Sequence, residues 1–154
     1  MRKCLKQRLN DRAVENFLSL YEKHKEHLDA HFVSEICTGE MQKIDARVWE
    51  LLLCEYFTEQ KLDFISPDHG PDFKIQSITG KTIWVEAICP NIQLSKDEKV
   101  INYLRRSEEQ SEFVEVPEEN LDLVITSAMK EKNDKFIKYI KEAVVGEGDI
   151  MLIA

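Results

Sequence analysis

The segment from Gly70 to Ile88, GPDFKIQSITGKTIWVEAI, constrains the fold most, because its pattern indicates two short strands joined by a glycine turn. Residues 73–78 alternate between apolar and polar side chains, as a half-exposed strand does. Residues 82–89 are rich in β-branched and aromatic side chains, which favour strands. The pattern therefore predicts an antiparallel hairpin that places Asp72 at the start of one strand and Glu86 near the end of the next.

Helical periodicity dominates the chain on both sides of this hairpin. Apolar residues recur every three or four positions through residues 9–28, through 44–56 and again along 121–144. Gly146 is expected to cap the last of these helices, and residues 150–154 are expected to form a buried strand. The predicted order is two helices, three strands, an irregular charged segment, a helix and a final strand.

The length suits one compact domain, because 154 residues is close to the commonest domain size. We expect a single domain over residues 1–154, with a helical extension over 1–38 and a core over 39–154. The apolar run that ends at Ala154 has no polar tail after it. We therefore expect the core to be truncated at this end and the natural chain to continue.

Charge and composition exclude several classes of protein. With 21 basic and 29 acidic residues the formal net charge is -8, which argues against a broad basic surface for nucleic acid, so any such contact is expected from a local patch. No window approaches the roughly 18 apolar residues of a membrane span, so we expect no membrane partner and a cytoplasmic location. The four cysteines are far apart and form no C-x-x-C pair, which favours reduced thiols over a zinc ribbon.

Two carboxylates on adjoining strands can share a divalent metal ion. Mg²⁺ prefers oxygen ligands and keeps several of its waters, so Asp72, Glu86 and one backbone carbonyl are enough protein ligands. The alternation along residues 82–89 places Glu86 on the same face as Trp84 and Ile88. A carboxylate between two large apolar side chains needs a partner.

This arrangement, with P-D on one strand, V-E-A on the next and a helical acidic residue before both, resembles the PD-(D/E)xK nuclease superfamily over roughly residues 45–154. The resemblance implies an α/β fold with a restriction-endonuclease-like three-layer core, in which helices flank a small mixed β-sheet. It implies Mg²⁺ or Mn²⁺ held by Asp72 and Glu86, with Glu50 as the helical acid. The implied activity is hydrolysis of phosphodiester bonds in nucleic acid, with DNA as the expected partner.

One position departs from the pattern of that superfamily. Ile88 stands where the superfamily has a lysine, whose ammonium positions the attacking water and offsets charge in the transition state. A substitute amine can come from Lys74, which shares a strand face with Asp72, or from Lys135 on the late helix. Lys135 and Tyr139 are four residues apart, as the resemblance expects of that helix.

A second class of function stays open, namely an inactive nuclease-fold module that binds a protein or a nucleic acid. Ile88 and the acidic net charge favour it. In this interpretation Asp72 is a turn residue, Glu86 forms a salt bridge to a helical lysine, and Glu50 lies on an exposed helical face.

Histidines offer one further site. His24, His27 and His31 follow one another at helical spacings of three and four, with Cys37 farther on, a pattern that can bind zinc on one helix face. The many Lys and Glu residues around them are equally typical of a solvated helix. His69, beside the P-D pair, is positioned in the sequence to touch a substrate phosphate, or to be a loop histidine without a task.

Overall fold

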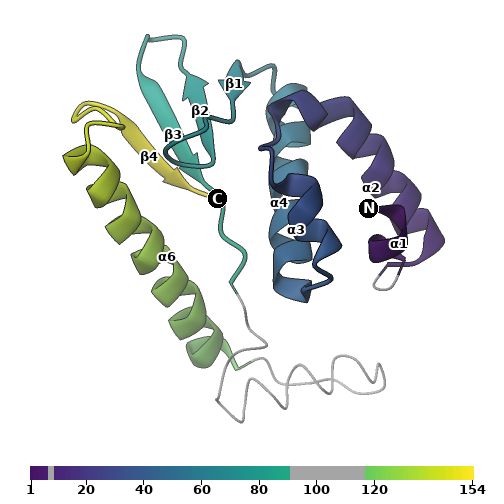
Figure 1. Cartoon of the computed structure of the whole chain (residues 1–154). Coiled ribbons are helices and arrows are strands. Elements are labelled where there is room, and N and C mark those ends of the chain that lie inside the picture. Colours follow the sequence, from purple (N-terminus) through teal and green to yellow (C-terminus); the bar gives the residue numbers. More distant parts are fainter. Residues whose placement is uncertain (7–8, 91–116) are drawn as a thin grey trace. The chain divides into compact units, whose positions relative to one another are not determined.

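The computed structural model of this chain describes residues 1–6, 9–90 and 117–154. It is a mixed α/β structure in which helices flank a small four-stranded mixed sheet (Figure 1). Two compact units divide it, residues 1–89 with 135–154, and residues 90–134. The predicted irregular segment falls almost wholly on residues 91–116, outside the described residues.

The elements in chain order confirm the predicted hairpin, the helix before it and the helix and strand after it. They are α1 Arg2–Leu5, α2 Asp11–His24, the 3-10 helix η1 Lys25–His27, α3 Phe32–Cys37, α4 Met41–Glu59, β1 Phe64–Ile65, β2 Phe73–Gln76, β3 Thr82–Glu86, α6 Glu118–Lys141 and β4 Ile150–Ile153.

The N-terminal extension is helical, but it is divided into short helices. Asn10 caps α2, because its side-chain oxygen accepts a hydrogen bond from the Ala13 N–H at 2.9 Å. The helix ends at His24, short of the periodic pattern, which continues to residue 28. Its buried apolar residues, Val14 and Phe17, share one core with the buried residues of α3 and the first half of α4.

Helix α4 connects this core to the sheet. Ile44 and Leu51 pack among the N-terminal helices, whereas the second half of α4 packs on the sheet through Leu53, Cys54 and Phe57. The helix therefore contributes to two separate cores, and Glu50 directly precedes Leu51, the last buried residue of the first one.

The sheet has the order β1-β2-β3-β4, antiparallel except for the parallel pair β3 and β4. In the hairpin Phe73 pairs with Val85, and Gly80 makes the turn with φ of 79°. Ile150 and Leu152 on β4 are 43% and 47% exposed, so the expectation of a buried strand is wrong. Strand β4 lies at the edge of the sheet, where Met151 and Ile153 are only partly buried and Ile150 and Leu152 on the other face are exposed.

The two faces of the sheet contact different helices. Phe73 and Val85 pack with the second half of α4, whereas Trp84 packs with Phe136 of α6 and with Val145. Successive side chains of a strand point to opposite faces. Glu86 therefore shares the face of Trp84, toward the last two turns of α6.

Helix α6 ends in a Schellman motif, and its cap differs from the one predicted. The Val144 N–H donates to the Tyr139 carbonyl at 3.0 Å and Ala143 adopts φ of 57°, so Ala143 is the left-handed cap residue. Gly146 lies beyond the cap, where its N–H donates to Asp149. The prediction of Gly146 as the cap is wrong because the helix stops at Lys141.

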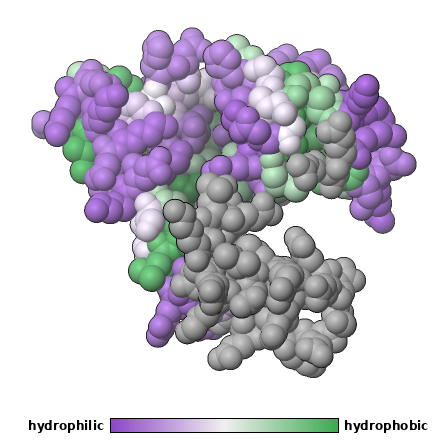
Figure 2. Space-filling view, turned by 60° about the horizontal axis from the view of Figure 1, so that its bottom comes forward, coloured by the Kyte–Doolittle hydropathy of each residue, from purple (hydrophilic) through white to green (hydrophobic). Residues whose placement is uncertain are grey.

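Hydrophilic side chains cover most of the described surface seen in Figure 2, with hydrophobic patches between them. No helix in the described ranges is long and apolar enough to cross a membrane.

Candidate functional site

The hairpin brings the two predicted carboxylates next to each other in the sheet register. Phe73 and Val85 are the last pair of the ladder, and Asp72 and Glu86 are the residues that come next to them, before Phe73 and after Val85. The Asp72 carboxylate also accepts a hydrogen bond from the Ala87 N–H at 2.8 Å, which holds it against the end of β3. Both acids thus lie at one end of the β2–β3 ladder.

Glu86 is completely buried, and a lysine from α6 lies beside it. The Lys135 ammonium is 3.5 Å from Glu86 Oε1, and the lysine side chain is 43% exposed. Burial on its own lowers the pKa of the Lys135 ammonium. The charges of Glu86 and Asp72, together with a hydrogen bond to Tyr139, outweigh burial and raise that pKa above its usual value. Lys135 therefore stays charged and interacts electrostatically with both Glu86 and Asp72.

Glu50 on α4 is close enough to Asp72 for the two charges to interact. Its side chain is 17% exposed and accepts a hydrogen bond from Arg47 at 2.6 Å, so the interpretation that placed it on an exposed helical face is wrong. Burial raises the pKa of Glu50 to about 7; the Arg47 cation opposes this rise and the charge of Asp72 adds to it. Glu50 is consequently an acid that exchanges its proton near neutral pH.

Arg47 completes the charged cluster, and sequence reasoning missed it. Its guanidinium binds Asp29 at 2.5 Å and Glu35 at 2.8 Å in addition to Glu50. The three-residue spacing from Glu50 was a usable signal, since residues i and i+3 are neighbours on a helix. Asp29 carried no such signal, because only the tertiary fold brings it to α4.

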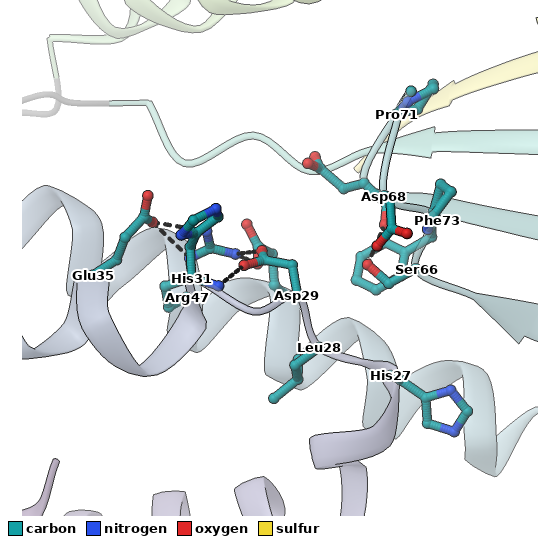
Figure 3. Close-up of a pocket in the computed structure, with 14 residues that line it drawn as sticks. His27, Leu28, Asp29, His31, Glu35, Arg47, Ser66, Asp68, Pro71 and Phe73 are labelled. Carbon is teal, nitrogen blue, oxygen red and sulfur yellow. Dashed lines mark hydrogen bonds and ion pairs between the residues drawn. The ribbon is translucent and has the colours of Figure 1, made fainter. Parts of the chain in front are cut away.

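A cavity of about 240 Å³ lies beside this cluster. Three parts of the chain line it. They are His27, Leu28, Asp29, His31 and Glu35 of the extension, Arg47 and Glu50 of α4, and residues 66–68 and 70–73 around the start of β2. Figure 3 shows Arg47 with Asp29 on one side of the cavity and the loop before β2 on the other. Asp72 contributes to the lining, whereas Glu86 and Lys135 do not.

The two candidate amines have different surroundings. Lys74 pairs across the hairpin with Trp84, and its ammonium lies 5.3 Å from the centre of that ring. Lys135 lies against Glu86 and interacts with Asp72. Of the two, the structure places Lys135 among the acids.

The predicted histidine set is not assembled on one helix face, because α2 ends at His24 and the chain turns before His31. His24 is buried against Glu55, and the His27 ring contacts Phe64 at 4.4 Å between centroids. His69 is exposed in the loop and does not line the cavity.

Among the described residues, no group of three or more His, Cys, Asp or Glu side chains is arranged to hold a metal ion. Comparison with known proteins adds no assignment, since no family model, curated protein or solved structure matches the chain.

Proposed function

We propose that this protein is a metal-dependent nuclease that hydrolyses phosphodiester bonds in nucleic acid, as a divergent PD-(D/E)xK-like domain without the usual motif lysine. The observation that carries the proposal is the position of Lys135, whose ammonium lies 3.5 Å from Glu86. Glu86 in turn ends β3 next to Ala87, whose N–H donates to the Asp72 carboxylate at 2.8 Å. A lysine from a different element thus supplies a cation where Ile88 cannot.

The acids suit a hard divalent cation such as Mg²⁺ or Mn²⁺. Carboxylate oxygens are the ligands that these ions prefer. Asp72 and Glu86 would supply two protein ligands, and water and substrate oxygens would supply the rest, because the described side chains form no group of three acids arranged to hold a metal ion. The charge of Asp72 contributes to the raised pKa of Glu50, which shows that these two carboxylates repel each other. A cation bound between strand and helix would relieve that repulsion. When bound, the ion lowers the pKa of a water ligand and offsets charge on the phosphate.

The protein groups have separate tasks in this proposal. Lys135 offsets negative charge on the scissile phosphate, and Tyr139, its neighbour one turn on, orients the ammonium. Glu50 accepts a proton near neutral pH, because burial and Asp72 hold its pKa at about 7. The cavity beside Asp72 gives substrate a place to approach.

One observation favours the second candidate, an inactive module that binds a protein or nucleic acid. Glu86 has no exposed surface and already pairs with Lys135, which is the salt bridge that a purely structural role requires. In the nuclease proposal Lys135 must move from Glu86 toward the phosphate when the ion binds. Its 43% exposure leaves room for that movement.

The test incubates the protein with supercoiled plasmid, single-stranded DNA and RNA in Mg²⁺ or Mn²⁺. Asp72→Asn and Lys135→Met should each abolish cleavage. Lys138→Met is the matched control, since Lys138 lies on the same helix and forms an exposed ion pair with Glu142. Cleavage that persists in Asp72→Asn would exclude this site. Nucleic-acid binding without any cleavage would favour the second candidate.

A further inference from the structure

Arg47 is the point at which the N-terminal extension meets the candidate site. Its side chain is only 11% exposed, and it binds carboxylates from three places in the chain. Asp29 precedes α3 and Glu35 lies within α3. Glu50 lies on α4, one helical turn after Arg47. One guanidinium therefore ties the extension to the helical acid of the site.

The same side chain also packs against the extension. The Arg47 guanidinium carbon lies 5.6 Å from the ring centre of Phe32, which is 1% exposed in the core of the N-terminal helices. Its Nε–H donates to Glu35 at 2.8 Å, so the planar fork is engaged at more than one nitrogen. A guanidinium held on several sides has one orientation available to it.

On the basis of the proposed function, we propose that Arg47 is a positioning residue: its guanidinium fixes Glu50 at the cavity, and it holds residues 28–37 as the wall that faces the loop of Asp72. The extension is then a working part of the nuclease site. Three carboxylates already bind the Arg47 guanidinium, so its role in this proposal is to hold protein groups and not substrate.

A positioning role and a purely electrostatic role of Arg47 lead to different expectations when Arg47 is replaced. If Arg47 acted only through its charge, its removal would strengthen Mn²⁺ binding, because the guanidinium would no longer compete with the ion for the nearby carboxylates. A positioning role predicts that kcat falls at least tenfold while Mn²⁺ binding does not improve. Arg47→Lys separates the two further, because lysine keeps the charge but lacks the planar fork that reaches three partners.

The experiment compares wild type with Arg47→Gln, Arg47→Lys and the double variant Asp29→Asn with Glu35→Gln. Arg2→Gln is the control, because Arg2 forms an exposed ion pair with Glu15 on α2. Each protein is assayed for Mn²⁺ affinity by calorimetry, for kcat and KM on single-stranded DNA, and for backbone hydrogen exchange over residues 28–37 by mass spectrometry.

We expect both Arg47 variants to lose kcat at least tenfold, and the double variant to raise KM with kcat within about threefold of wild type. Hydrogen exchange over 28–37 should accelerate at least tenfold in Arg47→Gln and stay unchanged in Arg2→Gln. Wild-type kcat in Arg47→Lys, or unchanged exchange in Arg47→Gln, overturns the inference. If Arg47→Gln does not fold, Arg47→Lys and the double variant decide it.

If the protein is not a nuclease, the same experiment gives a different set of results. Wild type that takes up no Mn²⁺ and cleaves nothing removes the nuclease proposal, and with it any catalytic positioning by Arg47. The exchange comparison needs no activity, so it still decides whether Arg47 holds residues 28–37 in place.

Discussion

The Lys135 ammonium on α6 lies 3.5 Å from the buried carboxylate of Glu86 on β3, although 49 positions separate the two residues in the chain. The pair joins a helix and a strand that local sequence patterns describe independently. It also places an amine beside the strand acid in a chain whose Ile88 cannot supply one.

Replacing Lys135 by methionine should destabilise the fold by about 2 kcal/mol, because a fully buried carboxylate would lose its cationic neighbour. The half-exposed position of the lysine keeps the effect below that of a completely buried pair. Urea unfolding at pH 7 measures the difference. The double variant with Glu86→Gln should recover most of the lost stability, and Lys138→Met should change it by less than about 0.5 kcal/mol. Equal effects of the two lysine variants would contradict this account of the pair.

Glu50→Gln should stabilise the protein at pH 8 and leave it nearly unchanged at pH 5. The folded pKa of Glu50, about 7, lies above the ordinary value of 4.5. Between these two values the folded state binds more protons than the unfolded state, so the stability contributed by Glu50 falls as pH rises through this window. The shift corresponds to at most about 3 kcal/mol. Urea unfolding across pH 5 to 8 tests it, and parallel curves for wild type and variant would show that Glu50 is not perturbed.

Much of the fold followed from local patterns in the sequence. The alternation after Asp72 and the turn at Gly80 were enough to predict the hairpin and, through it, the neighbouring positions of Asp72 and Glu86. Periodicity likewise located α4. These features depend on interactions between residues close in the chain, which a sequence displays directly.

The charged surroundings of the site could not be predicted from the sequence, because they depend on tertiary packing. The sequence named Lys135 as one of two possible amines, and only the fold separates it from Lys74. Nothing local indicated that Asp29 would reach Arg47. The predicted histidine site was wrong because helical spacing brings side chains together only while the helix continues, and α2 ends at His24.

Ala143→Gly should stabilise the protein by roughly 1 kcal/mol, because Ala143 adopts φ of 57° and glycine has no Cβ to strain that conformation. Thermal unfolding measures the gain. Ala128→Gly, in the interior of the same helix, should instead cost up to about 1 kcal/mol. A loss of stability in both variants would mean that α6 does not end in the left-handed cap described above.

The most direct test of the central claim is calorimetric titration of Mn²⁺ into wild type, Asp72→Asn and Glu86→Gln at pH 7.5. The account predicts saturable uptake by wild type, with affinity reduced at least tenfold in each variant and unchanged in Asp63→Asn, whose carboxylate lies outside the site. Uptake of equal affinity in all four proteins, or none in wild type, would contradict the claim that these two strand acids hold a metal ion.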